Sequence, residues 1–164
     1  KLFPDSKLII VLRNPVDKTY SHYYLSKKFG ETRTFEEVIK EEMNDILDWD
    51  VDSKDDNYFA TTVEKSTLAR GFYVEQLPIW FEQFSKNQIL IISSEDLASN
   101  TKKTMNDIFR FLNLPEYTIP NIDKVNVSKK SKMNLETRKI LINFFKSYNE
   151  QLYRFLNQSF DWDK

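Results

Sequence analysis

The chain has 164 residues, 40% of them hydrophobic and 30% charged, which is enough for one domain with a hydrophobic core. The formal net charge of -1 gives no global field that would attract nucleic acid. Cysteine is absent and His22 is the single histidine, which excludes disulfides, cysteine nucleophiles and thiolate or multi-histidine metal sites. No apolar stretch approaches the roughly 20 residues that a transmembrane helix needs, so no membrane span is expected.

The first predicted strand is the apolar run Leu8 to Leu12, whose composition is typical of a strand buried on both faces. Arg13 follows this strand directly. Asn14 and Pro15 then favour the start of a helix, which is predicted to continue to about Lys28. An arginine at the carboxyl end of a parallel strand, beside the positive end of a helix, lies where open α/β sheets bind anions, usually phosphates.

The middle of the chain is predicted to contain two more helices and an irregular stretch. Thr34 and Glu37 have capping-box spacing and predict a helix through about Leu47. Residues 49–65 are acidic and are interpreted as irregular. Residues 66–84 are predicted to form one long helix, kinked at its internal proline. Its aromatic residues are assigned to the core, and they are Phe72, Trp80, Phe81 and Phe84.

The second predicted strand is Gln88 to Ser93, and apolar residues at helical spacing then predict a helix around residues 105–112. Residues 114–132 are interpreted as a loop. The last helix is predicted to start after a cap at Asn134. Its apolar stripe consists of Leu141, Phe144, Phe145, Tyr148, Leu152, Phe155 and Leu156.

Only two strands are predicted, and both have the composition of buried, parallel strands. A two-stranded parallel sheet leaves two exposed apolar edges and is not a stable unit on its own. Further strands are therefore expected from residues outside this chain, from a partner chain or from segments assigned wrongly. The position of the first strand, a few residues after Lys1, favours residues outside this chain.

Three sequence blocks resemble the sulfotransferases that use 3′-phosphoadenosine 5′-phosphosulfate (PAPS), in particular heparan sulfate sulfotransferases and bacterial sulfotransferase domains. LIIVLRNPVDKTYSHYY looks like the family's 3′-phosphate motif, residues 70–97 are similar to its central helix, strand and acidic turn, and residues 134–162 to its C-terminal helix. The resemblance implies an α/β fold, with a P-loop-NTPase-like parallel sheet flanked by helices. It also implies that residues 1–164 are a single sulfotransferase-like domain that is incomplete at its N-terminus.

The resemblance implies transfer of a sulfuryl group from PAPS to a hydroxyl or amine acceptor, without a metal. Arg13 and Ser21 would bind the 3′-phosphate of PAPS or of its product, adenosine 3′,5′-bisphosphate (PAP). A guanidinium makes paired, charge-assisted bonds to phosphate, which independently supports Arg13. Periodicity alone would not select Ser21. The segment 126–132 lies where the family places a second cofactor-binding loop, and its candidate residues are Asn126, Ser128, Lys129 and Lys130.

Other parts of the family pattern have no counterpart. The family's 5′-phosphosulfate loop is rich in glycine and carries a lysine, whereas this chain has only Gly30 and Gly71, neither in such a setting. The catalytic base of the family commonly comes from the same upstream region, so no catalytic residue is assigned. We therefore expect the chain to supply the 3′-phosphate half of the site, to need a missing N-terminal segment, and to be inactive alone.

Alternative interpretations remain open at this point. The chain could belong to another nucleotide-binding α/β enzyme, such as a kinase, or to a non-catalytic scaffold domain of the same fold. Arg13 could form a salt bridge at the sheet edge, Ser21 could be an inert helix serine, and His22 could be a base or a packing residue. Glu95 and Asp96 fit either a carboxylate pair or the start of a short helix. The abundance of lysine, asparagine and isoleucine favours a bacterial enzyme, for which a cytoplasmic location is expected. The Golgi lumen is expected instead if the protein is a eukaryotic carbohydrate sulfotransferase.

Overall fold

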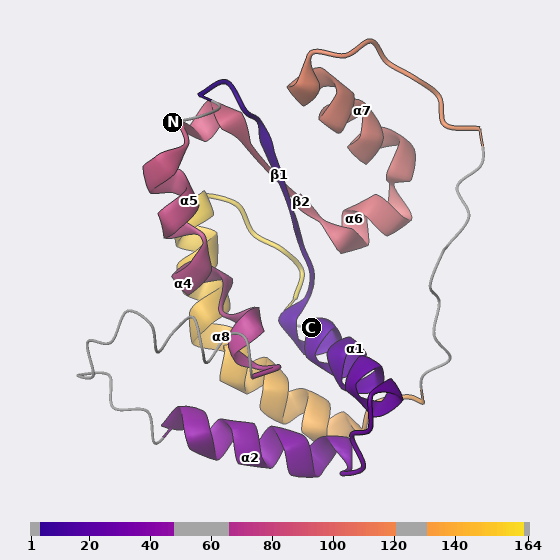
Figure 1. The fold of residues 1–164 in the computed structure, drawn as a ribbon, viewed down its shortest axis with the longest axis vertical. Coiled ribbons are helices and arrows are strands. Elements are labelled where there is room, and N and C mark those ends of the chain that lie inside the picture. The colour runs from indigo at the N-terminus through magenta and orange to yellow at the C-terminus, as the bar shows by residue number, and fades with distance from the viewer. Residues whose placement is uncertain (1–3, 48–65, 121–130, 163–164) are drawn as a thin grey trace. The chain divides into compact units, whose positions relative to one another are not determined.

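The computed structural model describes residues 4–47, 66–120 and 131–162 (Figure 1). Contacts divide the chain into two compact units. The strand unit comprises residues 1–13 and 77–129, and the helical unit comprises residues 14–76 and 130–164. The predicted irregular stretch 49–65 lies outside the described residues.

Two parallel strands form the sheet of the strand unit, as the sequence predicts. Strand β1 (Leu8–Leu12) pairs with β2 (Ile89–Ser93), so that Leu8 lies opposite Ile89 and Leu12 opposite Ser93. The other elements of this unit are α5 (Pro78–Gln83), the 3₁₀ helix η2 (Lys86–Gln88), α6 (Ser94–Ser99) and α7 (Thr101–Leu112).

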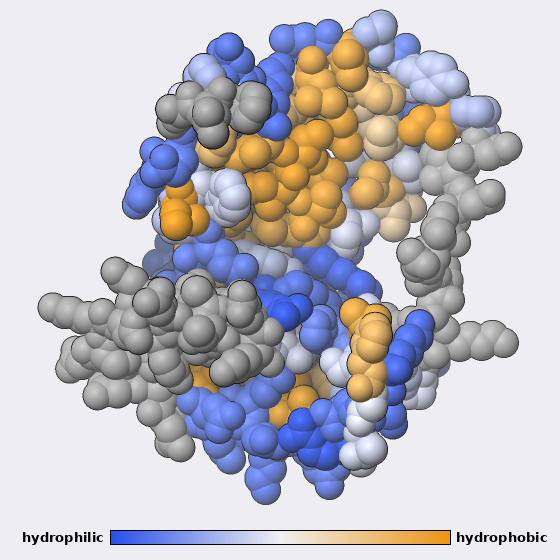
Figure 2. All heavy atoms as spheres, in the orientation of Figure 1, coloured by the Kyte–Doolittle hydropathy of each residue, from blue (hydrophilic) through white to orange (hydrophobic). Residues whose placement is uncertain are grey.

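The prediction that β1 is buried on both faces is wrong for the chain as described. Leu12 is buried, but the side chains of Ile9 and Val11 are 37% and 52% exposed. These two side chains alternate along β1 with less exposed ones and so share one face of the sheet, which the described residues leave partly uncovered. Figure 2 accordingly shows hydrophobic side chains gathered at the surface of the strand unit.

The short helix α6 begins where β2 ends. The Ser93 hydroxyl caps it by accepting a hydrogen bond from the Asp96 N–H at 3.0 Å. Glu95 and Asp96 lie in the first turn, where negative charge is favourable. Of the two interpretations of these carboxylates, the structure supports the start of a short helix.

The helical unit consists of α1 (Pro15–Lys28), α2 (Phe35–Leu47), the 3₁₀ helix η1 (Ala69–Gly71), α4 (Tyr73–Gln76) and α8 (Leu135–Leu156). The bounds of α1 are those predicted. The capping box before α2 is also confirmed, because the Thr34 N–H donates to Glu37 at 2.7 Å and the Glu37 N–H donates to the Thr34 hydroxyl at 3.3 Å.

The prediction of one long helix over residues 66–84 is wrong. The chain forms η1, α4 and α5 there instead. Pro78 is the first residue of α5, a position where its missing N–H costs no helical hydrogen bond, so the proline starts a helix and does not kink one. The core assignment is right for Phe72, which is 1% exposed, and wrong for Trp80, which is 47% exposed.

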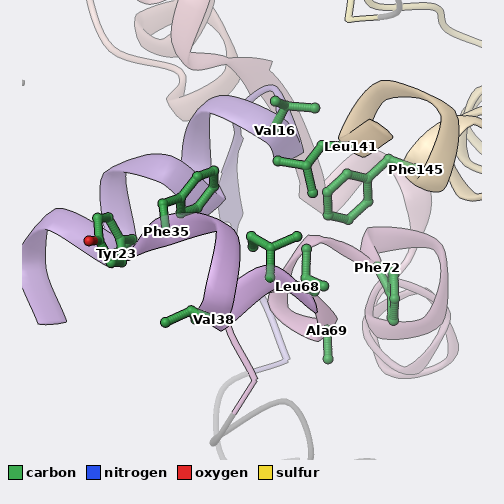
Figure 3. Packing of buried hydrophobic residues seen from close by; sticks show 10 residues of the cluster. Val16, Tyr23, Phe35, Val38, Leu68, Ala69, Phe72, Leu141 and Phe145 are labelled. Atoms are coloured by element: carbon green, nitrogen blue, oxygen red, sulfur yellow. The ribbon is translucent and has the colours of Figure 1, made fainter. Parts of the chain in front are cut away.

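The core of the helical unit forms where α1, α2, η1 and α8 meet (Figure 3). From α8, Leu141 and Phe145 are fully buried, as the apolar stripe predicts, whereas Phe155 is 42% exposed. Phe72 stacks on Tyr148 with ring centroids 4.0 Å apart. The buried cluster consists of Val16, Tyr23, Phe35, Val38, Ile39, Leu68, Ala69, Phe72, Leu141 and Phe145.

The described residues contain neither a candidate membrane-spanning helix nor a candidate metal-binding group. Within the part of the chain that the structure describes, no helix is long and apolar enough to cross a membrane. The same residues contain no group of three or more histidine, cysteine, aspartate or glutamate side chains that could hold a metal ion.

Gly71 is expected to tolerate no side chain. A Cβ there would lie 2.6 Å from the Phe145 ring and 3.1 Å from Pro15 Cβ. Because both neighbours belong to a packed core, we expect Gly71→Ala to lower the free energy of unfolding by about 1–3 kcal/mol in urea denaturation. The cost should shrink when Phe145→Leu is also present. The control is Lys146→Ala, at an exposed site on α8. If Gly71→Ala lowered the free energy of unfolding no more than this control, the packing described here would be contradicted.

The cap of α8 gives a second stability prediction. The Asn134 carboxamide oxygen accepts hydrogen bonds from the N–H groups of Glu136 and Thr137 at 2.8 and 3.5 Å. Asn134→Ala should lower the free energy of unfolding by about 1 kcal/mol. Asn143→Ala, at an exposed position inside the same helix, should be neutral or slightly stabilising because alanine is the better helix former. Equal effects of the two substitutions in thermal unfolding would show that the cap contributes nothing.

Candidate functional site

Arg13 lies at the carboxyl end of β1, as predicted, and is half-buried. It is the last residue of the strand unit, and the next residue, Asn14, is the N-cap of α1 in the helical unit. The chain therefore passes from a parallel strand through an arginine into a helix. This is the connection at which the sequence predicts an anion-binding site.

The first turn of α1 has protein partners of its own. The side chain of the buried Asn14 accepts a hydrogen bond from the Val16 N–H at 2.9 Å and donates one to the Trp162 carbonyl oxygen at 3.2 Å. Asp17, also in this turn, forms an ion pair with Arg138 at 2.7 Å. Because a capping side chain and a carboxylate already serve this end of the helix, any anion bound nearby depends on cationic side chains more than on the helix terminus.

Ser21 lies within α1 and is half-buried. By helical geometry Lys18 lies between Ser21 and His22 around the axis, about 60° from the first and about 40° from the second. The three side chains therefore share one face of α1. Sequence spacing alone places them together, but it does not show what else packs on this face.

Arg70, from η1, packs on the face of α1 that carries Lys18 and His22. Its guanidinium Nη1 lies 2.9 Å from Nε2 of His22. Because a guanidinium only donates, Nε2 must accept, which assigns the imidazole proton to Nδ1. Nδ1 faces the Thr67 hydroxyl at 3.5 Å. The Lys18 ammonium donates to the Arg70 carbonyl oxygen.

Burial and the charge of Arg70 alter the protonation of Lys18 and His22. Burial lowers the pKa of Lys18 to about 8, and the charge of Arg70 acts in the same direction. Burial, then Arg70 and then Lys18, lower the pKa of His22, whereas the carboxylate of Glu42 raises it. His22 is therefore neutral near pH 7, and its basic nitrogen is engaged by Arg70, which fits a packing or orienting role better than that of a base.

Two tyrosines that the sequence did not single out hold Ser131, which lies within the predicted cofactor-binding segment 126–132. Tyr24 Oη accepts a hydrogen bond from the Ser131 N–H at 3.1 Å, and Tyr20 Oη donates to the Ser131 carbonyl oxygen at 3.1 Å. The two rings meet edge to face with centroids 5.1 Å apart. Ser131 is thus fixed on α1. The predicted loop residues Asn126, Ser128, Lys129 and Lys130 lie outside the described residues.

Sequence patterns alone could not reveal these contacts. Arg70 is 48 residues from His22, and Ser131 is 107 residues from Tyr24. No local period connects residues so far apart. The one available signal was that Arg70 opens the second of the three sequence blocks and Ser131 lies just before the third.

Comparison with known proteins identifies the family. The family model described as "Sulfotransferase domain" matches residues 2–161. The chain is 31% identical over 176 residues to human "Carbohydrate sulfotransferase 15", a match that covers 97% of this chain and 31% of that protein. It is 25% identical to the Caenorhabditis briggsae "Bifunctional heparan sulfate N-deacetylase/N-sulfotransferase 1", covering 96% of this chain and 20% of that protein.

A solved structure shows the same fold. The sulfotransferase from Alicyclobacillus acidocaldarius superposes with a TM-score of 0.75 at 24% identity, over 98% of this chain and 59% of that chain. This chain thus spans less than a third of the two curated relatives and about three fifths of the solved structure. With a family model that matches almost every residue, the chain belongs to the sulfotransferase domain family.

Proposed function

We propose that this chain supplies the 3′-phosphate half of the PAPS site in an enzyme that transfers a sulfuryl group to a hydroxyl or amine. The observation that carries the proposal is Arg13, half-buried at the carboxyl end of β1 and directly before the capped helix α1. Membership of the sulfotransferase family supports this proposal over the kinase-like and scaffold alternatives.

The residues present fit a phosphate monoester. The planar guanidinium of Arg13 can donate two parallel hydrogen bonds to phosphate oxygens, and the Ser21 hydroxyl can donate a third. Asn126, Ser128, Lys129 and Lys130 are proposed to contribute further donors from the segment that precedes Ser131. None of these groups needs a metal ion to bind phosphate.

PAPS supplies the activated sulfuryl group. The acceptor oxygen or nitrogen forms a bond to sulfur while the bond from sulfur to the 5′-phosphate oxygen breaks, so PAP leaves and the acceptor proton passes to a base. By holding the 3′-phosphate, Arg13 and Ser21 would orient the far end of PAPS and contribute binding energy remote from the reacting atoms. The base and the groups around the 5′-phosphosulfate are expected from residues outside this chain.

The acceptor class follows from the relatives alone. Their names specify carbohydrate and heparan sulfate sulfotransferases, which favours a carbohydrate hydroxyl or amine as the acceptor of this enzyme. The chain spans only 31% and 20% of those proteins. The acceptor and the activity of the whole protein are therefore proposed and not inferred from the match alone.

Loss of Arg13 should weaken PAP binding selectively. We expect Arg13→Ala to raise the dissociation constant of PAP at least tenfold in calorimetric titration of the protein that contains this chain, because the variant leaves the 3′-phosphate without its paired donor. The same substitution should leave binding of adenosine 5′-phosphate, which lacks the 3′-phosphate, within about twofold.

The matched control is Arg154→Ala, which removes an arginine whose side chain is 76% exposed on α8 and should leave PAP binding unchanged. Unchanged PAP binding by a folded Arg13→Ala protein would refute the role of Arg13. Failure of the folded wild-type protein to bind PAP would refute the assignment of PAPS as donor.

Ser21 should contribute less than Arg13. One hydrogen bond to a charged phosphate is worth about 1.5–3 kcal/mol, so Ser21→Ala should weaken PAP binding by about tenfold to a hundredfold, and by less than Arg13→Ala does. Ser26→Ala provides the comparison, since this serine is half-buried in the same helix but is not proposed to contact the ligand. Equal affinities of the two variants would favour the inert-serine interpretation of Ser21.

A further inference from the structure

We propose that Lys18, His22 and Arg70 form a binding cluster for a tetrahedral oxyanion, on the face of α1 that also carries Ser21. The oxyanion is either the 3′-phosphate of PAPS or a sulfate or phosphate group of the acceptor. The identity of the bound oxyanion rests on the proposed function. The cluster of the three side chains does not, because all its contacts lie within the helical unit.

The contacts bring three nitrogen-bearing side chains together from two elements. Arg70 donates to Nε2 of His22 at 2.9 Å, and the Lys18 ammonium donates to the Arg70 carbonyl oxygen. The same ammonium lies over the Tyr73 ring, 5.4 Å from its centroid. All three members are half-buried, so they are held in place yet reachable from solvent.

The charge balance of the cluster favours an anion. The positive charge of Arg70 lies close enough to disfavour the charged form of Lys18, and burial reduces screening by water. The carboxylate that acts on His22 is Glu42 of α2, which accepts hydrogen bonds from the Leu68 N–H and the Ser66 hydroxyl, each at 2.8 Å. A bound oxyanion would offset the repulsion between the two cations.

Hydrogen-bond capacity also fits this ligand. An ammonium has three N–H donors, and the Arg70 carbonyl oxygen takes one of those of Lys18. Protonation of His22 would replace the hydrogen bond that Nε2 accepts from Arg70 with an N–H donor. It would also give the cluster a third positive charge, which a bound anion would stabilise. Anion binding should therefore favour the protonated form of His22, opposing the burial and the cations that disfavour it in the free protein.

His22 provides the readout because it is the single histidine of this chain. The complete protein that contains this chain is labelled with ¹³C-histidine, and the His22 signal is assigned by its loss in His22→Asn. Its pKa is then measured by NMR in sodium chloride and in sodium sulfate at matched ionic strength. The proposal predicts a saturable rise of the His22 pKa with sulfate, beyond any effect of chloride.

Lys18→Met tests the cluster while it keeps an apolar chain against Tyr73. In this variant the sulfate concentration for half-saturation should rise at least tenfold, whereas Lys18→Arg should respond like the wild type. Lys28→Met, at an exposed position in the last turn of α1, is the control for loss of one positive charge. A sulfate response that is absent from the folded wild type, or that is equal in Lys18→Met and the wild type, overturns the proposal.

Two nucleotides distinguish the sources of the oxyanion. If the cluster binds the 3′-phosphate, PAP raises the His22 pKa and adenosine 5′-phosphate does not. If it binds the acceptor, sulfate still raises this pKa when PAP is saturating. PAP that binds by calorimetry, together with a His22 signal that responds to neither PAP nor sulfate, would refute this inference and leave the proposed function intact. A sulfate response without PAP binding would refute only the proposed function.

Discussion

Close packing around the first turn of α1 is the constraint on which the helical unit depends. Asn14 joins this turn to the Trp162 carbonyl oxygen, and Pro15 lies against Gly71, which in turn packs on the Phe145 ring. The three sequence blocks that mark the family thus meet at one point, because each supplies a group in this contact. Only a residue without a side chain fits between the proline and the ring, so the glycine is required by packing and not by its backbone conformation.

Local sequence signals predicted the elements whose ends they determine. The Asn14–Pro15 pair, the capping box at Thr34 and the Asn134 cap each place hydrogen-bond partners within a few residues, and the helices start where these signals lie. The interruptions between residues 66 and 84 were missed because their apolar residues have helical spacing although the chain turns at Gly71 and restarts at Pro78. The exposure of Ile9 and Val11 could not be predicted either, since composition indicates what a strand can bury and not what covers it.

The candidate site was predictable only where its residues lie close together in the sequence. Arg13 and Ser21 belong to a contiguous motif, so their positions at the strand end and within α1 follow from local structure. Arg70 comes to His22 only through the packing of η1 on α1, which no local pattern encodes. Helix α1 therefore contributes to several parts of the candidate site. It carries Ser21, and its Lys18 and His22 contact Arg70. Its two tyrosines bind Ser131.

The central claim is that the end of β1 and the helix after it bind the 3′-phosphate of the sulfuryl donor. The most direct test is a crystal structure of the complete enzyme with PAP. The account predicts the 3′-phosphate within hydrogen-bond distance of the Arg13 guanidinium and the Ser21 hydroxyl, 2.7–3.2 Å for the N–H donors. A 3′-phosphate held by other residues, with Arg13 paired to a carboxylate, would contradict the account.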